Sequence, residues 1–380
     1  MKYFLSEEEL MVKELAHRIA EEKIIPVRQK YDEEEIFPHD IVKIMAESDL
    51  FRVFIPEEYG GLGAKIFPMV LAVEELSWGC GGIALAYAGT ALGAFPIILF
   101  GSEEQKSKYL PKIAEGTLAA FALTEAEAGS DAANIKTRAE KDGDYYILNG
   151  TKQFITNAGE ADIYTVIALT DPNKGARGAT AFILEKGMEG LEFGKKENKM
   201  GIRASVTREV IMKNVRVHKS QVLGKEGRGF IVAMKTFDHT RPGVAAQALG
   251  IAQAALDAAV KYANQRYQFG KPIASFQAIQ HMIADMGTKV EATRALIYSV
   301  ARAIDAGFTS PKESAMTKVF ASDVAMEVTT NAVQIFGGYG YMKEYPVEKM
   351  MRDAKITQIY EGTNQILRNV IASRIIKEAK

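Results

Sequence analysis

The sequence predicts an α+β protein of several domains, in which a helical region, a β region and a second helical region follow one another. Apolar residues recur at helical spacing over residues 1–120, β-branched and aromatic runs separated by turn signals fill residues 121–230, and alanine-rich helix formers return over residues 231–380. We therefore expect an N-terminal helical domain, a central antiparallel β-barrel or sandwich, and a C-terminal helical bundle.

The N-terminal region opens with a helix start signal. Ser6 followed by Glu9 is a capping-box pattern, and Leu10, Leu15 and Ile19 then follow at helical spacing. Further along, residues 76–102 carry no charge and are long enough to cross a bilayer. Because this stretch is rich in glycine and alanine, we expect a buried core helix and no membrane insertion.

The central region shows strands and turns. Residues 145–148, 163–168, 181–184 and 209–212 are rich in β-branched and aromatic residues, and we expect them to be strands. Turns are expected at residues 142–144, 149–150 and 171–173. In the C-terminal region, helices are expected at residues 244–263, 276–304 and 311–336.

Composition excludes several classes of function. A formal net charge of −1 gives no electrostatic basis for binding nucleic acid or an anionic membrane. Cys80 is the only cysteine, so one chain cannot form a disulfide, a cysteine-based zinc site or an iron–sulfur cluster, and no metal site is predicted. The acidic first turns lack the order of a signal peptide, so we expect a cytoplasmic protein.

The most informative segment is residues 359–366, Ile-Tyr-Glu-Gly-Thr-Asn-Gln-Ile. Glu361 stands among apolar and small neighbours, where partial desolvation would raise its pKa and make it a general base. Gly362 would let a ligand approach the backbone closely. The alternative is a helix start, with Glu361 or Thr363 capping a helix over residues 365–376.

Two further segments bring polar groups and aromatic rings together. Residues 121–131 place hydroxyls and backbone amides around Gly129, as a loop that binds a cofactor would, although a polar loop ending a strand is the alternative. Residues 152–159 place Phe154 two positions from Thr156, so that in a strand a ring and a hydroxyl would face the same side.

With these segments the chain resembles the acyl-CoA dehydrogenase family of FAD-dependent enzymes, from about Leu5 to the C-terminus. Further matching stretches are residues 238–241, 266–270, 334–338, 344–348 and 351–353. The resemblance implies the helix–barrel–helix fold and FAD held between the barrel and the C-terminal bundle. It also implies an acyl-CoA substrate, a homotetramer, and an electron-transfer flavoprotein as the electron acceptor.

The resemblance also implies a reaction. Glu361 would remove the proton α to the thioester while the β-carbon gives hydride to flavin N5, leaving a 2-enoyl-CoA. The thioester oxygen would be stabilised by the Glu361 backbone N–H and a flavin ribityl hydroxyl. Some relatives carry their base at the position of Thr240, which cannot act as one, so Glu361 is the remaining candidate. A surface ion pair is the alternative interpretation of the neighbouring Arg241.

Cofactor residues are implied in the same way. Around the isoalloxazine the resemblance places Phe121, Leu123, Thr124, Gly129, Ser130, Phe154, Ile155 and Thr156, with Thr156 as the N5 partner and Ser130 on either flavin phosphate or coenzyme A. On the pyrophosphate and adenine, largely of a neighbouring subunit, it places Arg266, Gln268, Phe269, Gln277, Gln334, Gly337 and Gly338, and it adds Thr363 and Gln365 to the cofactor site. The substrate residues are Ser130, Asp238, Arg241, Tyr360 and Gly362.

The acyl group is expected to be short or compact: butyryl-like, branched or alicyclic. Residues 83–100, which by resemblance line the acyl pocket, hold Leu85, Tyr87, Leu92 and Phe95 but no arginine or lysine, which argues against a dicarboxylic acyl group. Two alternative functions remain at this point. One is an oxygen-using acyl-CoA oxidase, and the other is a helical protein that binds acyl-CoA without turnover.

Overall fold

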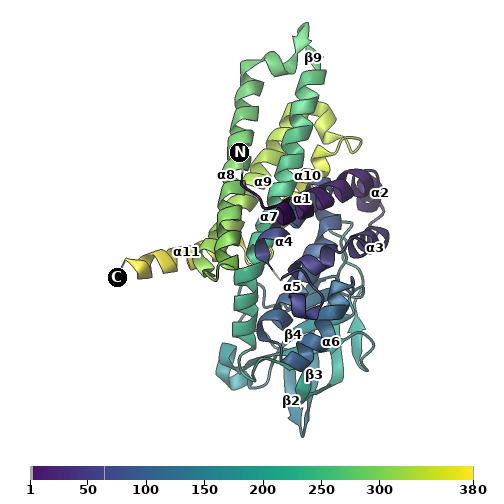
Figure 1. Cartoon of the computed structure of the whole chain (residues 1–380), viewed down its shortest axis with the longest axis vertical. Coiled ribbons are helices and arrows are strands. Elements are labelled where there is room, and N and C mark those ends of the chain that lie inside the picture. The colour runs from purple at the N-terminus through teal and green to yellow at the C-terminus, as the bar shows by residue number, and fades with distance from the viewer. Residues whose placement is uncertain (1–2, 64, 380) are drawn as a thin grey trace.

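A computed structural model describes residues 3–63 and 65–379, which form two helical regions on either side of a β-sheet (Figure 1). The N-terminal helices are α1 (Glu7–Ile19), α2 (Arg28–Glu33), α3 (His39–Glu47), α4 (Ile66–Gly79), α5 (Gly81–Phe100) and α6 (Glu103–Ala114). The main strands are β1 (Ala119–Ala122), β2 (Arg138–Asp142), β3 (Tyr145–Thr156), β4 (Ile163–Leu169), β5 (Ala179–Glu185), β6 (Leu191–Phe193), β7 (Thr207–His218) and β8 (Val222–Leu223). The C-terminal helices are α7 (Gly229–Gln265), α8 (Gln277–Asp305), α9 (Pro311–Phe336), α10 (Val347–Ile356) and α11 (Asn364–Glu378), with a hairpin of β9 (Tyr267–Gln268) and β10 (Lys271–Pro272) between α7 and α8. The expected helix–sheet–helix order is confirmed.

The helix signal at the N-terminus is confirmed. The Ser6 hydroxyl accepts a hydrogen bond from Glu9 N at 3.1 Å, and the Glu9 carboxylate accepts one from Ser6 N at 2.9 Å, which is a complete capping box. Two backbone N–H groups at the start of α1, which have no partner within the helix, thereby gain hydrogen-bond acceptors.

The uncharged stretch of residues 76–102 forms parts of two helices instead of one. Cys80 between α4 and α5 is extended, with φ −167° and ψ 117°, and is buried with its Sγ 3.1 Å from Lys349 Nζ. By length and composition α5 and α7 could each cross a membrane, but 72% of the relevant window of each is buried within the protein. Both are core helices of this fold, as expected for the first.

The sheet is mixed, which corrects the expectation of a purely antiparallel domain. Its strand order is β6-β7-β3-β2-β4-β5-β8, and the expected strands lie within β3, β4, β5 and β7. However, β1 pairs with β4 in parallel, with Ala119 opposite Ile163, and Arg138 of β2 also pairs in parallel with Leu169. Strand β1 follows α6 directly, and its partner β4 lies more distant in sequence than the intervening strands β2 and β3.

One expected turn is a bulge in a strand. Residues 142–144 do connect β2 to β3, but the register of β3 against β7 shifts between Leu148 and Gly150, inside the strand. Asn149 exchanges hydrogen bonds with Asn214 across the pair, at 3.0 and 2.8 Å. A Cβ at Gly150, where φ is +148°, would lie 2.6 Å from Thr137 Oγ1, so only glycine suits this bulge.

The C-terminal helices surround α7, which is 37 residues long and runs from the sheet to the β9–β10 hairpin (Figure 1). The helix expected over residues 244–263 is part of α7. Those expected over residues 276–304 and 311–336 correspond to nearly all of α8 and to all of α9. Between α10 and α11 the chain passes back toward the middle of α7, and α11 then projects from the body of the protein (Figure 1).

Gly93→Ala tests the close approach of α5 to β1. A Cβ at Gly93 would lie 2.6 Å from Ala120 N and 2.7 Å from Ala119 C, both backbone atoms, so we expect the free energy of unfolding to fall by about 1–3 kcal/mol. In α8, Gly287→Ala is the matched control: its Cβ would meet nothing within 4 Å, and we expect a gain of about 0.5–1 kcal/mol. Urea unfolding followed by circular dichroism measures both; equal effects would contradict the argument.

Candidate active site

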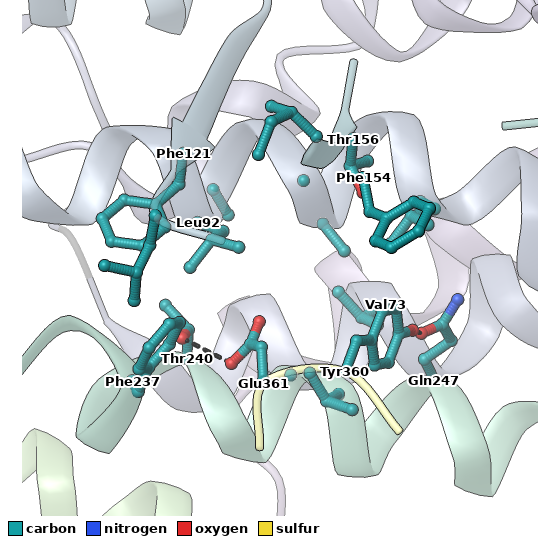
Figure 2. Close-up of a pocket in the computed structure, with 18 of the residues that line it drawn as sticks. Val73, Leu92, Phe121, Phe154, Thr156, Phe237, Thr240, Gln247, Tyr360 and Glu361 are labelled. Atoms are coloured by element: carbon teal, nitrogen blue, oxygen red, sulfur yellow. Dashed lines mark hydrogen bonds between the residues drawn. The ribbon is translucent and has the colours of Figure 1, made fainter. Parts of the chain in front are cut away.

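A pocket opens where the two helical regions meet the sheet (Figure 2). Helices α4, α5 and α7, the ends of β1 and β3, and the segment before α11 all contribute side chains to it. Its lining residues are Met69, Val73, Leu85, Ala88, Gly89, Ala91, Leu92, Phe121, Leu123, Thr124, Phe154, Ile155, Thr156, Phe237, Thr240, Gly243, Val244, Gln247, Tyr360 and Glu361. Among the described residues, Glu361 is the one carboxylate in this lining, whose other members are apolar except for the hydroxyls of threonine and tyrosine and the amide of Gln247.

Glu361 points into the pocket from a strained turn. Its φ is +50° and that of Gly362 is +98°, so two successive residues adopt left-handed backbone conformations. The Glu361 carboxylate accepts a hydrogen bond from Thr240 Oγ1 at 2.9 Å (Figure 2), and its carbonyl accepts one from Arg241 Nε at 3.2 Å. The cap of α11 is Thr363, whose hydroxyl accepts from Ile366 N at 3.3 Å, so the alternative role of Glu361 as a cap does not hold.

The surroundings of Glu361 make its carboxylate a stronger base. Burial raises the pKa of Glu361 to about 7, against the opposing effects of the Thr240 hydrogen bond and the positive charges of Arg241 and Lys318. A carboxylate with a pKa near neutrality accepts a proton more readily than a surface glutamate does, and about half of it is still ionised at that pH.

The backbone around Glu361 offers a free donor. Within residues 3–63 and 65–379, the Glu361 N–H makes no hydrogen bond, although the neighbouring amides of Tyr360 and Asn364 donate to Ile356 O and Gln358 O. An unpaired N–H beside a pocket carboxylate is suited to bind an oxygen that gains negative charge.

The ends of β1 and β3 form one wall of the pocket. Phe121, Leu123 and Thr124 come from β1 and its following loop, and Phe154, Ile155 and Thr156 come from β3, as the sequence predicted they would lie together. The hydroxyls of Thr124 and Thr156 make no hydrogen bond with any residue in the described part of the chain. Phe154 is 60% exposed and has a φ of +59° at a register shift of β3, which turns its ring toward the opening (Figure 2).

Buried polar side chains hold this wall in place. Lys152, fully buried, donates to Leu123 O at 3.0 Å and to Glu125 Oε1 at 2.7 Å, and Glu125 also accepts from two backbone amides of residues 136–137. Burial lowers the pKa of Lys152 to about 8 while the carboxylate of Glu125 opposes that shift. Asn157 Nδ2 lies within 3.2–3.4 Å of three oxygens on α5 and β1, and so ties the wall to the helix across the pocket.

A second group of predicted cofactor residues lies at the other end of α7. Arg266, Gln268, Phe269, Gly337 and Gly338 line a separate open cavity with Tyr262 and Tyr339, and the predicted Gln277 and Gln334 are exposed at the adjoining helix ends. Arg266 is about 39 Å along the helix from Thr240, at about 1.5 Å per residue. One chain therefore does not bring the two groups together.

Other predicted residues lie outside the pocket. Gly129 and Ser130 are exposed on the loop between β1 and β2, and Gln365 is exposed on α11.

Asp238 and Arg241 are buried on α7 with 3.6 Å between Asp238 Oδ1 and Arg241 Nη1, so the surface interpretation of Arg241 is wrong. Burial raises the pKa of Asp238 and lowers that of Arg241.

The apolar wall on α5 differs in part from expectation. Leu85 and Leu92 line the pocket, together with three small residues between them. Tyr87 instead faces the N-terminal core, where its hydroxyl donates to Leu50 O at 3.3 Å, and Phe95 stacks on His239. Helix geometry explains this, because Leu85 and Leu92 are seven residues apart on one face and Tyr87 is on another.

Sequence reasoning missed two buried polar residues of the site. Gln247 of α7 accepts a hydrogen bond from the Tyr360 hydroxyl (Figure 2), and its amide donates to Gly81 O at 2.9 Å. Lys318 of α9, fully buried, donates to Gly362 O at 2.8 Å and to Asn364 Oδ1 at 3.0 Å. A lone lysine or glutamine at the apolar spacing of a helix was the available signal. Among the described residues, no group of three or more His, Cys, Asp or Glu side chains could hold a metal ion.

Comparison with known families covers the three regions in order. Profiles described as the N-terminal, middle and C-terminal domains of acyl-CoA dehydrogenase match residues 6–117, 120–215 and 227–376. A curated relative, the acryloyl-CoA reductase (NADH) of Anaerotignum propionicum, is 48% identical over 380 residues, which is 99% of this chain and 96% of that protein.

Solved structures agree along the whole length. Butyryl-CoA dehydrogenase from Megasphaera elsdenii superposes with a TM-score of 0.96 at 47% identity, covering 99% of this chain and 100% of that one. A chain solved in work on the electron transferring flavoprotein of Acidaminococcus fermentans and flavin-based electron bifurcation has a TM-score of 0.97 at 51% identity, covering 99% of each. The protein therefore belongs to the acyl-CoA dehydrogenase family of oxidoreductases.

Proposed function

We propose that the protein is an FAD-dependent dehydrogenase of short or compact acyl-CoA thioesters, with Glu361 as the base that removes the α-proton. The observation that supports this most directly is the half-buried Glu361 carboxylate, which lies across the pocket from a wall with an exposed phenyl ring and two unpaired hydroxyls. Such a wall suits the flat, partly polar ring of a flavin, which needs both stacking surface and hydrogen-bond donors.

Each side chain has a role in this proposal. Thr240 donates to the carboxylate and fixes its direction, while the free N–H of Glu361 would donate a hydrogen bond to the thioester oxygen as that oxygen gains negative charge. Thr124 and Thr156 would hold the flavin ring, with Phe121, Leu123, Phe154 and Ile155 against its face or edge. Bound FAD supplies an acceptor for the β-hydride.

The separation of the two cofactor groups supports an oligomer. The cavity with Arg266, Gln268, Phe269, Gly337 and Gly338 is too distant from Glu361 to bind the same FAD within one chain. We infer that a second copy of the chain supplies these residues, with Gln277 and Gln334, to the pyrophosphate and adenine. The guanidinium of Arg266 can bind two phosphate oxygens together. A homotetramer of the kind implied by the family would provide this arrangement.

The remaining predicted contacts are proposals of the same kind. Thr363 and Gln365 at the start of α11 would reach the cofactor, while Ser130 on its exposed loop, Asp238, Arg241, Tyr360 and Gly362 would serve acyl-CoA. We propose an electron-transfer flavoprotein as the acceptor and the cytoplasm as the compartment. The likeness to a chain studied with such a flavoprotein, and the absence of a second redox centre from the sequence, support the acceptor.

The pocket wall indicates a short acyl group. Gln247 and Tyr360, joined by their hydrogen bond, lie with Val73 on one side of the space above Glu361 (Figure 2). Gln247 is also fixed to Gly81 O, so it cannot swing aside without leaving polar atoms unpaired. The name of the reductase from Anaerotignum propionicum supports a second candidate, the same chemistry run toward reduction of an enoyl thioester.

Glu361→Gln tests the proposed base. Because glutamine cannot take a proton, we expect loss of flavin bleaching when the FAD-loaded enzyme is mixed anaerobically with butyryl-CoA. In the native enzyme the rate constant should rise with pH through the raised pKa of Glu361, about 7, and level off above it, since only the carboxylate is active. Stopped-flow absorbance, recorded from about pH 5.5 to about pH 9, measures the loss of bleaching in the variant and the pH dependence of the native rate constant. Glu378→Gln, an exposed change on α11, should match the native enzyme; bleaching by Glu361→Gln would place the base elsewhere.

Gln247→Ala tests the limit on chain length. Removing the amide opens the wall and frees the Tyr360 side chain. The ratio of kcat/KM for octanoyl-CoA to that for butyryl-CoA should therefore rise by about 10-fold or more, because room for one or two further methylenes in an apolar pocket has an effect of about that size. Asn264→Ala removes a comparable amide from the exposed end of the same helix and should leave the ratio unchanged. An unchanged ratio in Gln247→Ala would show that chain length is limited elsewhere.

The acyl pocket should also reject a distal carboxylate. Among the described residues, its lining contains no lysine or arginine, so an anionic acyl group would be buried unpaired at a cost of several kcal/mol. We expect turnover of glutaryl-CoA to be at least about 100-fold slower in kcat/KM than that of butyryl-CoA, as measured with a dye acceptor. Comparable values for the two thioesters would refute this assignment.

A further inference from the structure

The turn that presents Glu361 is held by a cation on each side. Its two successive carbonyls, of Glu361 and Gly362, accept hydrogen bonds from Arg241 Nε at 3.2 Å and from Lys318 Nζ at 2.8 Å. Arg241 approaches from α7 and Lys318 from α9. Because a non-glycine residue at positive φ is unfavourable by about 1–2 kcal/mol, this turn persists only if its surroundings hold it.

Lys318 is unusual among the buried lysines of the chain. Lys152 has Glu125 at 2.7 Å and Lys349 has Asp353 in direct contact, but Lys318 has no carboxylate within ion-pair distance among residues 3–63 and 65–379. Its hydrogen bonds go to neutral oxygens, Gly362 O and Asn364 Oδ1. A buried ammonium without a paired carboxylate is costly, so packing alone would favour an apolar residue here.

Asn364 extends the contact into a network. Its side-chain Nδ2 donates to Ser322 Oγ and to Asp323 Oδ1, both at 2.8 Å, and its backbone N donates to Gln358 O at 3.0 Å. Asn364 is 2% exposed and is the first residue of α11. Lys318 therefore fixes the turn from behind and fixes the helix start that follows it.

We propose that Lys318 is a positioning residue for the base: its ammonium holds the Glu361–Gly362 turn through the Gly362 carbonyl, and its charge favours the carboxylate form of Glu361. This inference rests on the proposed role of Glu361 in α-proton removal. Among the described residues, Lys318 does not line the pocket and makes no hydrogen bond or ion pair with the Glu361 side chain, so its effect is exerted through the backbone and through its charge.

The charges around the turn agree with this role. Facing it are Asp238 and Arg241 from α7, Lys318 and Asp323 from α9, and Arg368 from α11, which pairs with Asp323 at 2.6 Å. Burial lowers the pKa of Lys318 to about 7, while Glu361 opposes that shift. The coupling is mutual, since the positive charge of Lys318 in turn lowers the pKa of Glu361.

Exchange of the α-proton tests the proposal, because in a thioester that has no β-hydrogen to transfer, exchange depends on the base and not on hydride transfer. The FAD-loaded enzyme is incubated anaerobically in deuterium oxide with 3-thiabutyryl-CoA, in which sulfur replaces the β-carbon and no β-hydride can be transferred, and deuterium at the α-carbon is measured by mass spectrometry. The variants are Lys318→Met, Lys318→Gln and Lys318→Arg. Lys312→Met is the matched control, because Lys312 lies on the same helix but pairs with Glu378 at the far end of α11.

In Lys318→Met we expect exchange to slow by about 10²-fold, as for a base misplaced by about 1 Å, with little change in KM or FAD content. The pH midpoint of exchange should move upward in the Met and Gln variants, because a cation that stabilises the carboxylate is gone, and should stay near the native value in Lys318→Arg. Lys312→Met should match the native enzyme.

Native exchange rate and native pH midpoint in folded, FAD-containing Lys318→Met would overturn the proposal. So would slower exchange explained entirely by lost FAD, with the midpoint unchanged. Should Lys318→Met fail to fold, the Lys318→Gln and Lys318→Arg variants provide the test. Equal pH midpoints of exchange in these two variants would overturn the proposal. Exchange that persists in Glu361→Gln would instead overturn the assignment of the base itself.

Discussion

The close approach of neighbouring backbones to α7 is the constraint on which the rest of this structure depends. Alanine and glycine fill its buried faces, and a Cβ at Gly250 would lie 2.2 Å from Glu74 O of α4. At the start of the helix, a Cβ at Gly229 would lie 2.5 Å from Thr180 C of β5. Small residues thus let one long helix touch both the sheet and the bundle, and so place Thr240 and Arg241 between them.

The elements could be predicted from the sequence where local pattern decides the structure. Periodicity identified the long helices and strands, and the Ser6–Glu9 signal is a contact within four residues. The Asn149–Gly150 bulge and the parallel pairing of β1 were missed because their partners, Asn214 and β4, are distant in sequence. An Asn-Gly pair suits a turn and a bulge equally, since both need positive φ.

The same distinction applies to the site. Glu361 and the two wall segments could be found because their residue types signal their chemistry in a short stretch. Gln247 and Lys318 act on residues more than 40 positions away, through contacts that only the packed helices create. The site thereby gains two buried cations, Arg241 and Lys318, behind one carboxylate. Burial disfavours the charged form of all three side chains, and the opposite charges nearby favour it.

Glu361 and Phe154, on opposite sides of the pocket, are both non-glycine residues at positive φ. Each conformation is disfavoured by about 1–2 kcal/mol relative to ordinary backbone. Glycine or asparagine would relieve that strain but remove the carboxylate or the ring. Selection for thermal stability alone would therefore act against these two side chains. The chain thus keeps a carboxylate and an aromatic ring in this pocket at the expense of folding free energy.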